Sequence, residues 1–139
     1  MLLFDEQNQE VDLEKFKADI LNDVKLENLD EDNEESLEQD LAQMYTDALD
    51  SQFQEFDLND EGGLEGITVF AGLGKKILEK IRKLVCPKLG NDASRESITD
   101  AVLEVIASIL PGGKIIRFVI RKLVHFIIGR GVQAFCPAP

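Results

Sequence analysis

The sequence predicts an all-α fold of about five short amphipathic helices, the last three of which form a small helical bundle. Apolar residues recur at spacings of three and four along most of the 139 residues, as they do on one face of a helix. No segment alternates apolar and polar residues as a half-buried strand does. Hydrophobic residues make up 44% of the chain, which excludes wholesale disorder.

Charge divides the chain into two parts. Residues 1–66, the acidic part, hold 22 acidic and three basic residues and have a net charge of −19. Residues 67–139, the basic part, hold five acidic and 12 basic residues and have a net charge of +7. We expect the first part to be a helical pro-region or regulatory segment and the second to be a basic amphipathic helical domain. Gly62 and Gly63, after Asn59-Asp60-Glu61, are typical of a flexible joint and would be the site of proteolytic processing. An ordinary interhelical loop is the alternative.

Two helices are expected in the acidic part. Leu13, Phe16 and Ile20 belong to an apolar stripe that predicts a helix over about 12–26. A second stripe predicts a helix over about 34–57. The acidic run at 30–35 repels itself and is expected to be a solvated linker, with a cation site or a site for a basic partner as the alternative.

The first helix of the basic part is expected from about Ile67 to Cys86. Its apolar stripe includes Phe70, Leu73, Ile77 and Ile81, and its opposite face carries four lysines. The helix must end near Cys86 because the following proline disfavours helix at the residue before it.

The second helix of the basic part is expected to reach Leu110, where Pro111-Gly112-Gly113 stops it. Ser97, with Asp100 three residues later, resembles a capping box at its start. Asp92 and Ser94 are the alternative caps.

The third helix, expected over about 114–128, has two contrasting faces. On a helical wheel at ~100° per residue, its charged residues fall within roughly 140° of arc. That face consists of Lys114, Arg117, Arg121, Lys122 and His125, and only Phe118 interrupts it. The apolar side is wider than packing on one side of a small bundle requires. Some of it is therefore expected to face another helix, a partner or a membrane.

We expect no enzyme, no metal site and no cofactor. His125 is the only histidine, and catalysis would require it beside Cys86, Cys136 or a serine. Its alignment with cations favours a place on the basic face instead. Gly72-Leu73-Gly74-Lys75-Lys76 superficially resembles a phosphate loop, but it follows no strand and lacks the Ser or Thr after the lysine.

Neither a membrane span nor a signal peptide is predicted. The most apolar run, 115–128, carries three cations and a histidine that a lone spanning helix tolerates poorly. Met1-Leu2-Leu3-Phe4 is followed at once by Asp5 and Glu6, which leaves too short an apolar core for a signal peptide. If a leader was removed, we expect a secreted protein or one stored in granules or vesicles. Otherwise we expect a cytoplasmic or membrane-peripheral protein.

The basic part resembles a known family. KKILEKIRKLV at 75–85, SITDAVLEVIASIL at 97–110 and KIIRFVIRKLVHFIIGRGVQAFC at 114–136 resemble the NK-lysin and granulysin branch of the saposin-like proteins. The resemblance covers about residues 67–136 and implies a leaf of four or five short helices that attacks microbial membranes. Several members of that family are made with pro-segments. Cys136 would stand for the fifth cysteine of the family, whereas Cys86 matches none, and most of the cysteine pattern is missing.

Residues and resemblance together predict a membrane-active protein, antimicrobial, pore-forming or lipid-perturbing, that the acidic part keeps neutral. Cations on one helical face attract anionic lipid at ~1 kcal/mol each, and an adjoining apolar face can then enter the headgroup boundary. The acidic part would contact and shield the basic part, mainly by burying apolar faces of both. Anionic membrane lipids are the expected partners, and oligomers on the membrane are an open alternative.

The residues expected at the membrane form two sets. The headgroup contacts are Lys75, Lys76, Lys80, Arg82, Lys83, Lys114, Arg117, Arg121, Lys122 and Arg130. The apolar wedge is Phe70, Leu73, Ile77, Ile81, Phe118, Val119, Leu123 and Phe126.

Two other functions remain open. A non-enzymatic interaction module could bind a partner helix or a lipid in an apolar groove, with the acidic segment as a regulatory arm. Nucleic-acid binding by the basic part is the third candidate, but the net charge opposes it and aromatic residues for base stacking are not interleaved among the cations. No specific nucleic acid is therefore expected.

The two cysteines leave two arrangements open. Cys86 and Cys136 each precede a proline at the end of a helical segment, so a bridge that joins two helix exits is favoured slightly. In a saposin-like leaf, however, Cys136 would lie near the start of the helix that Cys86 ends. Twelve helical residues span ~18 Å, whereas a disulfide requires Cα atoms within about 7 Å. The saposin-like arrangement therefore requires free thiols.

Overall fold

Apolar stripes fold the chain into α-helices, which confirms the all-α prediction. The computed structural model describes residues 2–26, 34–52, 62–90 and 93–136. Short 3-10 turns at Cys86–Lys88 and Pro111–Gly113 end two of the helices. The α-helices in these ranges are α1 (Leu13–Leu26), α2 (Glu34–Gln52), α3 (Gly62–Val85), α4 (Arg95–Ile109), α5 (Arg117–Arg130) and α6 (Val132–Phe135).

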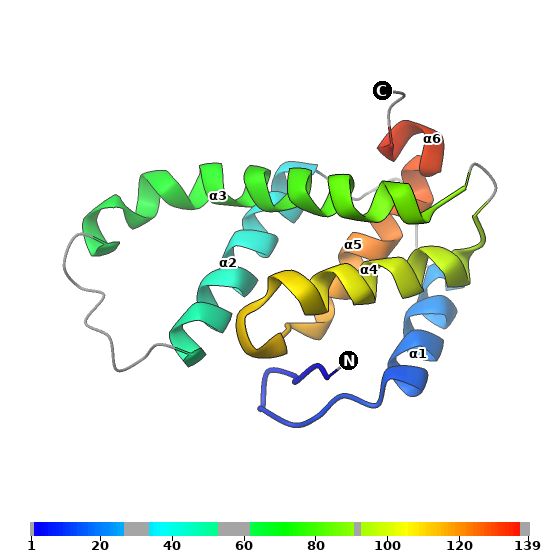
Figure 1. The fold of residues 1–139 in the computed structure, drawn as a ribbon, viewed down its shortest axis with the longest axis horizontal. Coiled ribbons are helices and arrows are strands. Elements are labelled where there is room, and N and C mark those ends of the chain that lie inside the picture. The colour runs from blue at the N-terminus through cyan, green and yellow to red at the C-terminus, as the bar shows by residue number, and fades with distance from the viewer. Residues whose placement is uncertain (1, 27–33, 53–61, 91–92, 137–139) are drawn as a thin grey trace.

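The helices cross in two directions. In Figure 1, α3 and α4 run along the long axis of the molecule, and α1, α2 and α5 run across them. Contacts join α2 to α3 and α5, α4 to α3 and α5, and α1 to α4. Each amphipathic helix therefore has neighbours on which to bury its apolar stripe.

One hydrophobic core takes side chains from both the acidic and the basic part. Ile20 of α1 and Leu41 of α2 are fully buried in the same cluster as Ile81 of α3, Ile106 of α4 and Leu123 of α5. Burying one such side chain stabilises the fold by about 1.5–3 kcal/mol. The acidic part is therefore bound to the basic part chiefly by apolar packing.

Helix boundaries differ from the sequence expectation at the starts of α3 and α4. Gly62 and Gly63 are the first residues of α3, which begins before the expected Ile67, while 59–61 lie outside the described residues. The expected end of the second helix, 53–57, also lies outside them, as do 30–33 of the acidic run. At the start of α4, Ser94 is the cap, because its Oγ accepts a hydrogen bond from the Ser97 N–H at 3.0 Å.

The last long helix begins at Arg117 rather than Lys114 because the preceding residues pair with the N-terminal arm, residues 2–11. The Ile115 N–H donates to the Phe4 carbonyl at 2.7 Å, and the Phe4 N–H donates to the Gly113 carbonyl at 2.9 Å. Gly113 has a φ of 71°, and a Cβ there would overlap the Leu2 carbonyl oxygen, so this junction requires glycine. The sequence did not predict the arm.

A disulfide joins the end of α3 to the end of α6. The Cα atoms of Cys86 and Cys136 lie 5.7 Å apart across this bridge. Beside it, Arg82 Nε donates to the Phe135 carbonyl at 2.8 Å, and the Arg82 guanidinium lies 4.8 Å from the centre of the Phe135 ring. The Phe135 ring also meets Phe126 edge-on. The bridge and these contacts fix α6 to the bundle.

Candidate membrane-binding surface

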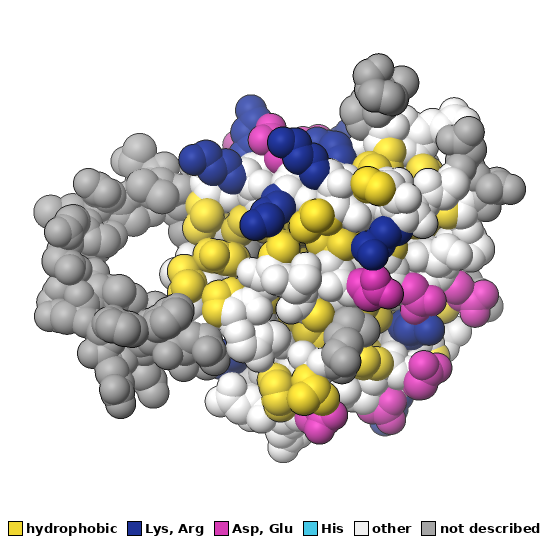
Figure 2. All heavy atoms as spheres, viewed as in Figure 1, with side chains coloured by type: hydrophobic (Ala, Val, Ile, Leu, Met, Phe, Trp, Pro, Cys, Tyr) yellow, Lys and Arg dark blue, Asp and Glu magenta, His cyan; other side chains and the backbone are white. Residues whose placement is uncertain are grey.

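The first group of predicted lipid contacts is an open row of lysines on α3. Lys75, Lys76, Lys80 and Lys83, here called the lysine face, are all exposed. Within the described part of the chain, no carboxylate forms an ion pair with Lys76, Lys80 or Lys83. Figure 2 shows Lys and Arg side chains gathered along this edge of the molecule, next to hydrophobic surface. Arg82 differs, because it is half-buried against Phe135.

The second group, on α5, is paired with the acidic part. Arg117 Nε lies 3.2 Å from Glu6 Oε1, and Arg130 Nη2 lies 3.5 Å from Glu34 Oε1. Lys122 Nζ donates to Asp40 Oδ2 at 2.8 Å and to Ser36 Oγ at 2.6 Å. Arg117, Lys122 and Arg130, here called the paired cations, thus contact the N-terminal arm and α2.

The two remaining predicted cations lie near the arm. Lys114 is half-buried in the segment that pairs with Phe4. Arg121 is half-buried and, with Asp12 and Asp19, lines a cavity of about 300 Å³ between the arm, α1 and α5. Charge segregation is incomplete, because Lys17 of α1 reaches Asp100 of α4 at 2.8 Å.

Ionisation of the acidic side chains reflects these contacts. Burial alone would raise the pKa of Glu6, but hydrogen bonds from its own backbone and from Arg117 outweigh it and leave that pKa lowered. A backbone hydrogen bond from Gln9 likewise lowers the pKa of Asp5. Burial raises the pKa of Glu38 on α2, and the neighbouring Glu34 raises it further. The arm is therefore held by charged carboxylates, whereas α2 includes one whose ionisation is disfavoured.

Most of the predicted apolar wedge lies in the core. Ile77, Ile81, Val119, Leu123 and Phe126 are buried, and Leu73 packs partly against them. Phe118 is 59% exposed beside the paired cations, and the Phe70 side chain lies outside the described residues. In this conformation only Phe118 of the described wedge residues stands free at the surface.

The expected place of His125 on an open basic face was wrong. His125 is 4% exposed, and its Nε2 has no hydrogen-bond partner among the described residues. The basic face of α5 is open at Arg117 and Phe118 but closes towards His125, because α1 and α2 pack against this helix. A helical wheel drawn for one helix cannot include the neighbours that cover it.

Helix α2 of the acidic part approaches α3 closely at one glycine, Gly74. A Cβ added at Gly74 of α3 would overlap the backbone carbonyl of Glu38 on α2, whereas a Cβ at Gly72 would meet open space. The two helices can approach this closely only because Gly74 has no side chain. A small residue inside a helical stripe was the one sequence signal for this contact.

The sequence did not identify the residues that cover α5. Glu6, Glu34, Ser36 and Asp40 carry the contacts, yet nothing in their spacing distinguishes the three acids from the other acidic residues of the first 66 positions. Only the opposite net charges of the two parts indicated that such contacts would form.

Among the described residues there is neither a group of side chains that could hold a metal ion nor a helix that could span a membrane. In the ranges that the structure covers, no three or more His, Cys, Asp or Glu side chains are grouped to hold a metal ion. None of the helices described has both the length and the apolar character needed to cross a membrane.

The chain matches no protein-family model, no curated protein and no solved structure.

Proposed function

We propose that this protein binds anionic membranes through the lysine face of α3 and perturbs them when the acidic part releases α5. One observation carries the proposal: the cations fall into two groups. The lysines of α3 are exposed, whereas Arg117, Lys122 and Arg130 of α5 are paired with the arm and α2. The first group can bind a surface at once, and the second becomes available only on opening.

Electrostatic attraction brings the closed protein to the membrane. Each lysine near an anionic surface contributes ~1 kcal/mol, and the attraction fades within a Debye length. The four lysines of α3 project from one long helix, so several can reach the surface together. This step requires no rearrangement of the fold.

Perturbation of the bilayer requires the wedge to leave the core. Leu37, Leu41 and Met44 of α2 are buried against the basic part, at about 1.5–3 kcal/mol for each side chain. Exposed ion pairs contribute only about 0.2–1 kcal/mol each. Apolar packing of α2 is therefore the main restraint, and the paired cations mainly fix where α2 lies.

The disulfide supports a place outside the reducing cytosol. Disulfides persist in secreted proteins and oxidising compartments and are rare in the cytosol. Cys86 and Cys136 are bridged, so secretion or storage in a granule or vesicle is the localisation we propose.

An interaction module that binds a lipid or a partner helix is the second candidate. The observation that favours it is an open, partly apolar groove beside α4, with Leu2 and Leu84 exposed in its walls. This function does not require α2 to move.

Sedimentation with vesicles tests the first step. Replacing Lys80 and Lys83 by Gln should weaken binding of the full chain to phosphatidylglycerol-containing vesicles about thirtyfold, for ~1 kcal/mol lost at each lysine. The matched control replaces the exposed Lys15 and Arg95 by Gln, which removes the same charge from other helices. Equal losses in both variants, or equal binding to pure phosphatidylcholine vesicles, would contradict the proposal.

A further inference from the structure

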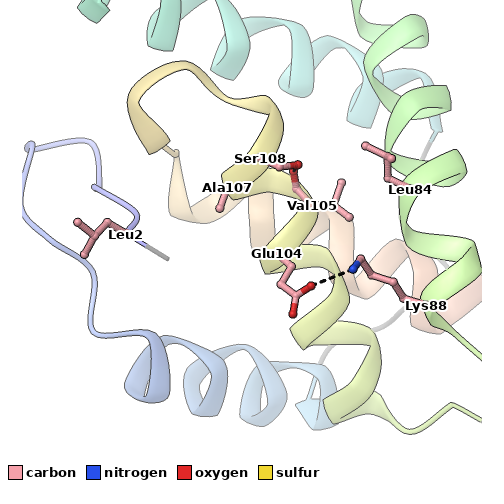
Figure 3. A pocket seen from close by; sticks show the side chains of 7 residues that line it. All are labelled: Leu2, Leu84, Lys88, Glu104, Val105, Ala107 and Ser108. Carbon is pink, nitrogen blue, oxygen red and sulfur yellow. Dashed lines mark hydrogen bonds and ion pairs between the residues drawn. The ribbon is translucent and has the colours of Figure 1, made fainter.

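Exposed apolar side chains converge on one groove of about 490 Å³. In Figure 3 its floor is α4, with Val105, Ala107 and Ser108, and its walls are Leu2 of the arm and Leu84 of α3. Three large apolar side chains are exposed in the described part of the chain, and two of them, Leu2 at 59% and Leu84 at 39%, line this groove. Apolar surface left open in a concave site is typical of ligand binding.

Charge at the rim favours an anion. On α4, the two acidic residues nearest the groove are already paired, because Asp100 lies 2.8 Å from Lys17 and Glu104 lies 3.0 Å from Lys88. On α3, Lys80 precedes Leu84 by one helical turn and Lys76 precedes Lys80 by another, so both lie on the side of the helix that carries the groove wall. Neither of these exposed lysines pairs with a carboxylate of the described residues. On α3, the unpaired charge that lies one helical turn from the groove wall is therefore the positive charge of Lys80.

Size favours a single alkyl chain over a helix. The groove volume falls in the lower half of the range typical of small-molecule sites, about 300–1,000 Å³. A helix with its side chains is about 10–12 Å across and binds through anchors spread over two turns. Here the apolar lining amounts to a few side chains around Val105, which an unbranched chain can cover.

We infer that the groove between the arm, α3 and α4 binds a free single-chain anionic amphiphile of the fatty-acid class. The alkyl chain lies over Val105 and Ala107 between Leu2 and Leu84, and the anionic head reaches Lys80 and Lys76. This site is separate from the contact of α2 with α5 and does not depend on release of the acidic part.

Calorimetric titration with dodecanoate below its micelle-forming concentration tests the site. The full chain should bind one dodecanoate, and Ala107→Phe should weaken binding by about tenfold or more, because a phenyl group occupies the space of at least two CH2 groups. Leu84→Ser removes an apolar wall of the groove at an exposed position and should weaken dodecanoate binding by a similar factor. This second variant keeps the test valid if Ala107→Phe misfolds. Ala18→Phe, at an exposed position on α1, is the matched control and should bind like the parent.

The head of the ligand is tested separately. The double variant Lys76→Gln with Lys80→Gln should bind dodecanoate about three- to tenfold more weakly than the parent. The parent should prefer dodecanoate to dodecyltrimethylammonium by a similar factor. Equal binding of the two amphiphiles would overturn the anionic assignment. The site would be overturned if the parent bound no dodecanoate, or if neither groove variant weakened the binding. It would also be overturned if the parent formed a dimer that Ala107→Phe abolishes and bound no amphiphile. Vesicle binding of Ala107→Phe and Leu84→Ser, which keep the lysine face intact, reports on the proposed membrane function independently.

Discussion

Glu6 and Glu38, two residues of the acidic part, have opposite effects on how firmly that part docks on the basic part when they are ionised. Glu6 binds Arg117 of α5, and its pKa lies below the ordinary 4.5. Glu38 lies on α2 close to α3, and burial, with Glu34 beside it, raises its pKa above that value. The first carboxylate holds the arm on the basic part, and the second weakens the docking of α2 when it is ionised.

The pH dependence of stability follows from these two signs. For Glu6, the contribution is present above the unfolded pKa and is lost as pH falls through the lower folded pKa. For Glu38, stability decreases as pH rises from about 4.5 through the raised folded pKa. In urea unfolding, Glu38→Gln should therefore be more stable than the parent at pH 7, and the advantage should vanish below pH 4.5.

The isosteric Glu6→Gln variant is the matched control with the opposite sign. It should be less stable than the parent at pH 7, and the difference should vanish in acid as the parent carboxylate is protonated. A Glu38→Gln variant that is less stable at pH 7 would show that Glu38 supports docking when charged, contrary to the geometry.

At the scale of elements, the disulfide closes a loop that contains α4, α5 and α6. Cys86 and Cys136 are 50 residues apart, so the bridge restricts much of the basic part in the unfolded chain. For a loop of this length, the chain-entropy relation gives about 4 kcal/mol of stabilisation. The bundle of the basic part is thus held by its core and by one bridge.

Reduction tests this contribution. We expect the free energy of unfolding in urea to fall by about 4 kcal/mol when dithiothreitol is added. The double variant Cys86→Ala with Cys136→Ala should have the lower stability with or without the reductant, which controls for the reagent itself. If reduction leaves the unfolding midpoint of the parent unchanged, the bridge does not restrain the fold.

The helices were largely predictable because their signals are local. The apolar stripe from Leu13 to Ile20 marks α1, and Pro87 and Pro111 mark the ends of α3 and α4. Ser94 could be named as one of three caps but not selected, because the choice depends on backbone geometry beyond the residue itself. Each of these features involves residues within one or two turns of one another.

The arrangement of the candidate surface was less predictable because it depends on distant contacts. The lysine face followed from the spacing along α3. The pairing of Lys122 with Asp40 did not follow from the sequence, because the two residues lie more than 80 positions apart. The burial of His125 did not follow either, because whole neighbouring helices cover it. The arm was missed because its pairing with Gly113 and Ile115 carries no periodicity.

In the whole molecule the acidic and basic parts share one core, and we propose that separating them activates the protein on membranes. Gly74→Ala targets that contact, because the added Cβ overlaps the Glu38 carbonyl. Such an overlap costs about 1–3 kcal/mol, and about 1.4 kcal/mol is enough to raise the population with α2 released tenfold. Gly72→Ala adds the same group in open space on the same helix.

Dye release from phosphatidylglycerol-containing vesicles by the full chain is the most direct measurement, with hydrogen exchange of α2 amides to report release. Gly74→Ala should show faster exchange of the α2 amides and should release dye about tenfold faster, whereas Gly72→Ala should behave like the parent. Leu103→Ala, a buried change on α4 that costs about 2–5 kcal/mol, controls for lost stability and should release less dye than Gly74→Ala. Faster exchange in α2 without faster dye release, or equal release by Leu103→Ala, would contradict the proposal that release of α2 activates the protein.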